Sequence, residues 1–248
     1  MIFRQLFEPG SSTFTYLIGC DDTRRAVLID PVLETAERDL AALEELGLTL
    51  ATTIETHIHA DHVTAASRLR SLTGCQVAVP GAADVACADI AVSEGSPIGI
   101  GSLTLRLLFC HGDPGDQHSY LFVDGSGARV FTGDALLIDG CGRTDFQNGD
   151  AAKLYRSVRD KIFTLPPDCL VFPAHDYEDR CVSTIAQERA RNPRLSDDIA
   201  LDEFLEIMAA LDLPYPKRID VAVPANRSCG TTHPQPHSGD RVEQRDQG

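Results

Sequence analysis

The stretch Thr56-His57-Ile58-His59-Ala60-Asp61-His62 places three imidazoles and one carboxylate within seven residues, directly after the apolar run 51–54. Neutral imidazole suits zinc, copper, iron and nickel, and a carboxylate adds a hard oxygen ligand. An isolated histidine is usually an ordinary surface or core residue. Four ligand-type side chains at this spacing instead favour a loop that supplies ligands to one or two metal ions.

The length and the charge limit the classes of fold and partner. The chain has 248 residues, enough for one large α/β domain or two small ones. Its formal net charge of −15 argues against nucleic acid and against an anionic membrane surface, because both need a basic footprint. An anionic substrate must therefore meet local positive charge.

The N-terminus and the cysteines indicate a cytoplasmic enzyme. Residues 1–9 lack the apolar core of a signal peptide, and no run approaches the roughly 18 apolar residues of a membrane helix. The eight cysteines form no Cys-x-x-Cys pair, which excludes a zinc ribbon and a thioredoxin-like motif. We therefore expect reduced thiols and a cytoplasmic location.

Short β-rich runs alternate with amphipathic helical runs. We expect strands at 14–18, 26–29, 51–55, 76–79, 103–109, 119–123, 129–132 and 170–172, and helices at 34–46, 62–73, 150–163, 179–191 and 202–211. Gly74 is the expected stop of the second helix and Asp150 the N-cap of the third. This alternation predicts a layered α/β domain over residues 1–227. Residues 228–248 contain almost no apolar residue and predict a disordered tail.

Ligand-type residues follow several of the expected strands. They lie in the loops 57–62, 110–118, 133–134 and 174–175. Strand-end loops gather at one edge of a layered α/β structure, so we expect the site at that edge. An aspartate or histidine after a strand is more often a turn residue, but Asp134 and His175 occur together with the histidine cluster. Their joint occurrence makes both of them candidate site residues.

At this point the residues carry a family resemblance. THIHADH at 56–62, FTGDALL at 131–137 and FPAHDY at 172–177 resemble the metallo-β-lactamase fold, an αββα sandwich with its metal site at one sheet edge. More narrowly, the chain resembles the persulfide dioxygenases, the ethylmalonic-encephalopathy protein family. The segments that carry this resemblance are LFEPGSSTFTYLIG at 6–19, AVLIDPVLETAERD at 26–39, TGDALLIDGCGRTDFQNGDA at 132–151, LYRSVRDKIFTLP at 154–166, NPRL at 192–195 and VPANRSCG at 223–230.

The resemblance covers about residues 2–230 and implies an iron enzyme. Such an enzyme holds one Fe(II) per chain and oxidises glutathione persulfide with O2 to sulfite and glutathione. The implied ligands are the first histidine of the motif, the aspartate of TGDALL and a histidine of the middle loop. The first two correspond to His57 and Asp134. A face of two histidines and one carboxylate leaves positions open for substrate sulfur and oxygen.

The third ligand departs from the family pattern. The middle loop normally reads like TPGHT, whereas this chain has Cys110-His111-Gly112-Asp113-Pro114. Counting without gaps from the strands on both sides puts Asp113 where the histidine is expected. His111 lies two residues earlier and His118 five later, and either would supply an imidazole if the loop is rebuilt. The sequence leaves His111 and Asp113 as alternatives of similar weight.

The resemblance also suggests roles for neighbouring residues. His59, Asp61, His62 and His175 fill positions that bind metals in hydrolase relatives, and here they are expected to act in catalysis by orienting ligands and bonding to water or substrate. Tyr177 resembles a family tyrosine that reaches toward the substrate.

Two further positions in the family segments carry an expectation. Arg143 is the candidate for gripping a glutathione carboxylate, with a structural ion pair to Asp139 or Asp145 as the alternative. Cys141 is expected in the core, and Cys229 is expected to be a reactive thiol near the chain end.

Three functions are compatible with the sequence. The favoured one is the persulfide dioxygenase, for which the resemblance suggests a homodimer and a sulfurtransferase that supplies the persulfide. The second is a hydrolase of glutathione thioesters of the glyoxalase II type, with two zinc ions per chain bridged by Asp134. The third is a relative with an impaired metal site that carries persulfides or thiols. It is motivated by the altered middle loop alone.

Overall fold

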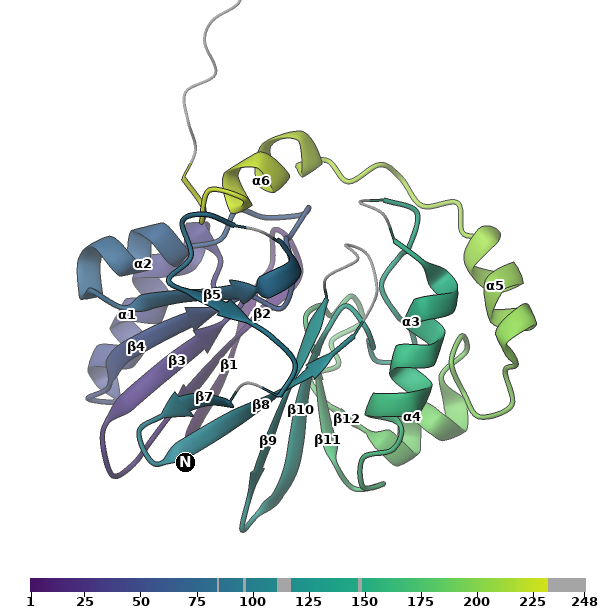
Figure 1. Ribbon diagram of the computed structural model, residues 1–248, viewed down its shortest axis with the longest axis horizontal. Coiled ribbons are helices and arrows are strands. Elements are labelled where there is room, and N and C mark those ends of the chain that lie inside the picture. The colour runs from purple at the N-terminus through teal and green to yellow at the C-terminus, as the bar shows by residue number, and fades with distance from the viewer. Residues whose placement is uncertain (84, 96, 111–116, 147–148, 232–248) are drawn as a thin grey trace, which may run out of the picture.

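Two six-stranded β-sheets pack face to face, and helices cover their outer faces (Figure 1). The computed structural model describes residues 1–83, 85–95, 97–110, 117–146 and 149–231. The first sheet has the strand order β1-β2-β3-β4-β5-β6 and the second has the order β12-β11-β10-β9-β8-β7. Strands β3 to β6 run parallel to one another, and β10 runs parallel to β11. The remaining pairs are antiparallel.

The strands of the first sheet are β1 (Ile2–Glu8), β2 (Thr13–Gly19), β3 (Arg25–Ile29), β4 (Thr49–Ile54), β5 (Gln76–Pro80) and β6 (Ile90–Val92). Those of the second are β7 (Pro97–Ile100), β8 (Leu103–Phe109), β9 (His118–Asp124), β10 (Gly127–Gly133), β11 (Leu170–Pro173) and β12 (Ser183–Thr184). The helices are α1 (Ala36–Glu45), α2 (Ala66–Thr73), α3 (Ala151–Ser157), α4 (Ile185–Arg191), α5 (Leu201–Ala209) and α6 (Ile219–Asn226), with short turns η1 (Leu33–Thr35), η2 (Gly81–Ala83) and η3 (Val158–Ile162).

The buried apolar runs of the sequence explain the layers. Successive side chains of a strand point to opposite faces, so a strand that is buried on both faces reads as a continuous apolar run. In β2, Tyr16 packs with Phe131 and Phe172 of the other sheet, whereas Leu17 packs with Leu43 of α1 and Leu69 of α2. The second sheet is covered in the same way from its outer side, by residues of α3, η3, α4 and α5.

The structure confirms the predicted fold class and most of the predicted elements. Gly74 adopts a left-handed conformation at the end of α2, and the Asp150 carboxylate accepts a hydrogen bond from Lys153 N at the start of α3. Strands β1, β6, β7 and β12 and helix α6 were not expected. Helix α6 contains Pro224, a residue that sequence reasoning places outside helices.

Two predicted helices begin later than expected. The helix expected from residue 62 begins at Ala66, because the chain bends at residues 62 and 65 and Thr64 pairs with Val32 in an isolated bridge. The helix expected from residue 179 begins at Ile185. There residues 183–184 join the second sheet as β12, and the Thr184 hydroxyl caps the helix by accepting a hydrogen bond from Gln187 N.

The expectation of eight reduced cysteines is wrong for two of them. Cys87 and Cys229 form a disulfide across 142 residues of sequence, so Cys229 is not a free thiol. Cys141 is buried in the core as expected. Residues 228–231 of the predicted tail are described and Cys229 is 1% exposed, while 232–248 lie outside the described residues. Within the described part of the chain, no helix is both long and apolar enough to cross a membrane.

Candidate metal centre

The site lies where three strands end. His57 follows β4 after two residues, Asp134 follows β10 directly, and His175 follows β11. The residue before Asp134 must be a glycine. Gly133 has a φ of 54°, and a Cβ there would lie 2.9 Å from Thr56 Oγ1 and 3.0 Å from Gln117 Nε2. This close approach brings the end of β10 against the histidine loop.

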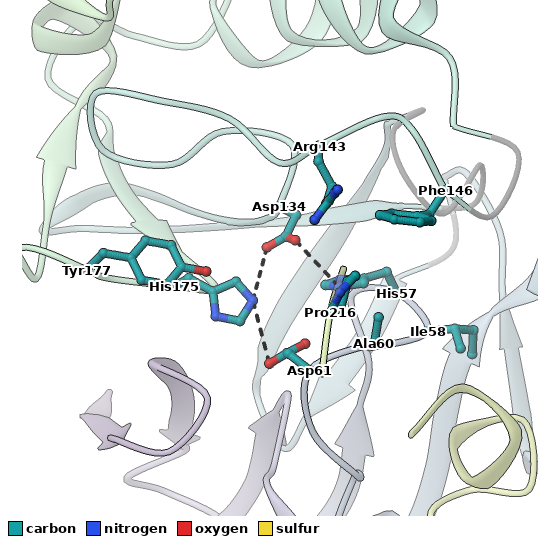
Figure 2. A pocket seen from close by; sticks show the side chains of 10 residues that line it. All are labelled: His57, Ile58, Ala60, Asp61, Asp134, Arg143, Phe146, His175, Tyr177 and Pro216. Atoms are coloured by element: carbon teal, nitrogen blue, oxygen red, sulfur yellow. Dashed lines mark ion pairs between the residues drawn. The ribbon is translucent and has the colours of Figure 1, made fainter. Parts of the chain in front are cut away.

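The structure brings His57, Asp61, Asp134 and His175 together around one cavity (Figure 2). His57 Nε2 lies 3.9 Å from Asp134 Oδ2, and His175 Nε2 lies 3.4 Å from Asp134 Oδ1. His175 Nε2 also lies 3.9 Å from Asp61 Oδ2. Loops from both sheets therefore supply the side chains of this cavity.

His57 is held as a neutral imidazole. It is 3% exposed, and its Nδ1 lies 2.9 Å from Thr56 Oγ1. Burial, together with the neighbouring His59, lowers the pKa of His57 to about 4. Its Nε2 lone pair is therefore free for a metal at neutral pH, because only the unprotonated imidazole binds a metal.

His59 is held differently. Its Nε2 lies 3.1 Å from Asp30 Oδ1 and 3.3 Å from Glu55 Oε2, and all three side chains are almost completely buried. Burial alone would lower the pKa of His59, but the two carboxylates outweigh it and raise the pKa well above its usual value. A protonated imidazole is no metal ligand. His59 is therefore disfavoured as a ligand as long as both carboxylates face it.

A hydrogen-bonded network orders the other side of the loop. Asp61 Oδ2 lies 2.9 Å from His62 Nδ1 and accepts a hydrogen bond from Thr13 Oγ1 at 3.1 Å. Thr13 itself contacts Ser11, whose hydroxyl donates to Glu8. Although burial acts in the opposite direction, His62 and His175 hold the pKa of Asp61 well below its usual range. The network keeps this carboxylate charged and directed at the cavity.

The residues present fit a metal ion. The buried side-chain atoms that have no hydrogen-bond partner within the described residues include Asp134 Oδ1, His59 Nδ1 and His62 Nε2. Ligand atoms about 2.1 Å from a shared ion lie at most about 4.2 Å apart. The 3.9 Å between His57 Nε2 and Asp134 Oδ2 falls within this limit and is too long for a hydrogen bond. A second possible ligand group, His59, Asp61 and His62, has its ligand atoms within 4.8 Å of one another.

Two cavities share four residues as walls, Asp134, Arg143, His175 and Tyr177, whereas His57 and Asp61 line the first cavity alone. The first has a volume of about 210 Å³ and includes Phe146 and Pro216. The second has about 510 Å³ and extends between residues 137–143 and 176–180 to Arg194, Leu213 and Pro214. Both are bordered by Tyr177, which is 71% exposed and stacks on His175 at 5.9 Å between ring centroids. The site therefore opens, past Tyr177, onto the larger cavity.

The cations of this cleft differ in their partners. Arg143 donates from Nε and Nη2 to the two carboxylate oxygens of Asp145, each at 2.7 Å, which is the ion pair that the sequence left as an alternative. Arg180 pairs with Asp139. Arg194 donates to the Cys141 carbonyl at 3.0 Å, and no carboxylate among the described residues pairs with it.

His111 and Asp113, the alternative third ligands, lie outside the described residues. His118, which the sequence also offered, lies in β9, where its backbone N–H donates to the Thr56 carbonyl at 2.8 Å. Its ring lies edge-on to Tyr120.

Three contributors to the site were missed in the sequence. Glu55 lies two residues before His57 and reads in the sequence as the last residue of a strand. Thr13 lies in the first family segment, and Asn226 lies in the last one. The only signal for Thr13 and Asn226 was that both lie in those segments. Their contacts with residues 59–64 join positions that are at least 48 residues apart in the sequence.

Comparison with known proteins agrees with this geometry. Residues 9–175 match the profile of the Metallo-beta-lactamase superfamily. The chain is 51% identical over 236 residues to the persulfide dioxygenase ETHE1, mitochondrial, of Homo sapiens, which covers 94% of this chain and 91% of that protein. It is 34% identical to a hydroxyacylglutathione hydrolase of Rhodospirillum rubrum over 67% of this chain and 63% of that protein.

The solved structures place the chain more narrowly. The crystal structure of ETHE1 from Myxococcus xanthus has a TM-score of 0.88 and 51% sequence identity, and the match covers 93% of this chain and all of that one. The match to the human protein has the same identity and nearly the same coverage. The chain therefore belongs to the persulfide dioxygenase family of the metallo-beta-lactamase superfamily.

Proposed function

We propose that the protein is an iron(II)-dependent dioxygenase that oxidises glutathione persulfide with O2 and water to sulfite and glutathione. The observation that carries the proposal is the facing pair of His57 Nε2 and Asp134 Oδ2 in a chain of this family. A site of two histidines and one carboxylate is typical of non-haem iron oxygenases. Here the third ligand is proposed to come from the middle loop, as His111 or Asp113.

The metal would be held at the narrow end of the cleft. His57 and Asp134 would bind it, and iron(II), when bound, would supply the electron transfer to O2 that a closed-shell ion such as zinc lacks. His57 is fixed by Thr56, and Asp134 is fixed through its carbonyl, which accepts a hydrogen bond from Gly142 N at 2.7 Å. These contacts hold both ligands in place before the metal binds, which supports tight binding.

Residues around the ligands are proposed to orient the reactants. Asp61 and His175 form the wall of the cavity beside Asp134, the buried His62 holds Asp61 from behind, and Tyr177 forms the outer border. The hydroxyl of Tyr177 points along this wall toward the cavity (Figure 2). A persulfide that enters the first cavity would meet these polar groups at its terminal sulfur.

The larger cavity suits the peptide part of the substrate. Glutathione carries two carboxylates, and the walls of this cavity bring Arg143, Arg180 and Arg194 to an otherwise acidic protein. Arginine binds carboxylates with two parallel hydrogen bonds. Arg143 and Arg194 are proposed as carboxylate anchors, and Arg194 is favoured because Arg143 already pairs with Asp145.

A hydrolase with two metal ions is the second candidate. The group His59, Asp61 and His62 favours it, as does the similarity to the hydroxyacylglutathione hydrolase. In such an enzyme Asp134 would bridge two zinc ions that activate a water. The two carboxylates on His59 oppose this arrangement, since they disfavour the neutral imidazole that a second ion needs.

The test is purification without oxygen, loading with iron(II), metal analysis and oxygen uptake on addition of glutathione persulfide. About one iron per chain with persulfide-dependent oxygen uptake and sulfite release is the expected result. Two zinc ions per chain with thioester hydrolysis and no oxygen uptake would favour the hydrolase. Protein that binds no metal would favour the persulfide or thiol carrier. The homodimer, the sulfurtransferase and the cytoplasmic location stay predictions.

A further inference from the structure

The histidine loop is fastened from the opposite end of the chain. The side chain of Asn226, at the end of α6, is 4% exposed and makes three hydrogen bonds to that loop. Its Nδ2 donates to the carbonyls of His59 and His62, each at 2.8 Å, and its Oδ1 accepts from Thr64 N at 2.9 Å. One side chain thus fixes three backbone groups in the stretch that follows His57, the proposed metal ligand of this loop.

The residues after Asn226 continue this contact. The Cys229 carbonyl accepts a hydrogen bond from Ser67 N, in the first turn of α2. Gly230 has a φ of 85°, and a Cβ there would lie 2.0 Å from the Thr64 carbonyl oxygen, so only glycine allows this approach. The segment 226–230 is therefore packed directly against the backbone that follows the metal loop.

The disulfide ties the same segment to the first sheet. Cys229 is buried, whereas Cys87 is half-buried in the connection between β5 and β6. Asn226 and Cys229 are three residues apart, and Cys229 N donates to the Asn226 carbonyl at 3.0 Å. Breaking the disulfide would free the turn 226–229 from Cys87, and this turn positions Asn226 against the histidine loop.

We propose that Asn226 is a positioning residue for the metal loop and that the Cys87–Cys229 disulfide fastens it, which makes metal retention dependent on the redox state of this pair. The inference rests on the proposed metal centre, but it does not depend on which reaction the centre catalyses. The structure already shows the fastened state.

A small thiol would reduce the Cys87–Cys229 disulfide in two steps. The thiolate attacks Cys87 Sγ, the half-buried sulfur, and the S–S bond breaks with its electron pair on Cys229 Sγ, which takes up a proton. A second thiol then attacks the mixed disulfide and leaves Cys87 as a thiol. Two small thiols are oxidised to one disulfide and supply the two protons, while the protein gains two thiols. Glutathione, a product of the proposed reaction, belongs to this class.

The experiment measures the rate at which the protein loses Co²⁺ or Fe²⁺ to a chelator, below the melting temperature of every variant. The samples are the oxidised protein, the protein reduced with a phosphine and desalted without oxygen, and the variants Cys87→Ser and Asn226→Asp. Asparagine and aspartate have the same shape, so Asn226→Asp keeps the acceptor for Thr64 N and removes both donors. Cys181→Ser is the matched control, because Cys181 is an exposed free thiol.

Reduction and Cys87→Ser are expected to speed metal loss severalfold, and Asn226→Asp about tenfold, which is typical of residues that orient metal ligands. Cys181→Ser should leave the rate unchanged. Six of the eight thiols should titrate in the unfolded, unreduced protein. Eight titratable thiols, or a lower melting temperature with unchanged metal loss in these variants, would overturn the proposal. Redox-dependent metal loss without oxygen uptake would leave it standing and reject the dioxygenase.

Discussion

Glu55 Oε2 lies 3.3 Å from His59 Nε2, on the same nitrogen that faces Asp30. One carboxylate on a histidine is the usual arrangement behind a metal-binding imidazole, because it orients the ring and selects its tautomer. Two buried carboxylates instead favour the imidazolium. This pair therefore offers a physical reason for the single metal ion per chain that is proposed above.

The substitution Glu55→Gln tests whether the two carboxylates on His59 limit the site to one metal ion. It leaves Asp30 as the one carboxylate behind His59 and so restores the arrangement that suits a ligand. The zinc content after dialysis should rise from about one toward two ions per chain, measured by elemental analysis. Glu55→Asp, which keeps the charge, is the control. An unchanged zinc content in Glu55→Gln would show that the two carboxylates do not decide the number of metals.

His57→Ala and Asp134→Ala should each abolish persulfide-dependent oxygen uptake, because each removes a proposed iron ligand. The fold should survive, since both side chains lie in strand-end loops outside the apolar clusters of the core. Oxygen uptake, iron content and thermal unfolding are measured together. Full activity in either variant would contradict the assignment of that ligand.

The substitution Asp113→His tests the third ligand. If Asp113 occupies the ligand position of the middle loop, an imidazole there should raise the iron occupancy per chain after loading. His111→Ala is the complementary variant and should lower the occupancy only if His111 binds the metal. Unchanged occupancy in Asp113→His, with a loss in His111→Ala, would assign the position to His111.

Arg194→Gln should raise the KM for glutathione persulfide by about tenfold and leave kcat nearly unchanged, because a charge-assisted contact to a substrate carboxylate contributes on the order of 1.5 kcal/mol. Arg143→Gln is the comparison, since its guanidinium is engaged by Asp145. A larger rise in KM for Arg143→Gln would mean that this ion pair opens to the substrate and that Arg143 is the main anchor.

The stability of the metal-free protein should fall in acid partly because of His118. Burial lowers the pKa of His118 to about 4, below the usual value of 6.5. Between these values the unfolded chain binds a proton that the folded chain does not, so the free energy of unfolding falls as the pH is lowered through this window. At about pH 5 the loss is about 2 kcal/mol relative to pH 7.

The variant His118→Gln isolates this contribution. Its urea unfolding curves at the two pH values should show about 2 kcal/mol less difference than those of the unchanged protein. His57, which has a similarly lowered pKa, titrates in both proteins and cancels in the comparison. Equal pH dependence in the two proteins would mean that His118 is accessible to protons in the fold.

Local patterns allowed most of the fold and half of the centre to be predicted. The loop 57–62 and the strand ends before Asp134 and His175 are signals within a few residues, and the parallel strands bring them together. Helix α6 was missed because Pro224 and its short apolar pattern do not indicate a helix. Strand β12 has two residues and becomes a strand only by pairing with β11.

The remaining features depend on contacts between distant segments. The disulfide spans 142 residues, and neither cysteine has a local pattern that indicates a partner. Glu55 is close to the motif in sequence, but its effect on the pKa of His59 acts together with that of Asp30, which directly follows β3. Arg143 gave two alternatives, and its ion pair with Asp145 is present in the fold while its contact with a substrate stays a prediction.

The hydrogen bonds of Asn226 also impose an order on biosynthesis. His59 and Asn226 are 167 residues apart, so a ribosome makes the histidine loop well before the residue that fixes its backbone. During this interval the nascent chain carries the imidazoles without the groups that fix their backbone. Durable capture of the metal is therefore a late event, which follows release of the C-terminal turn from the ribosome.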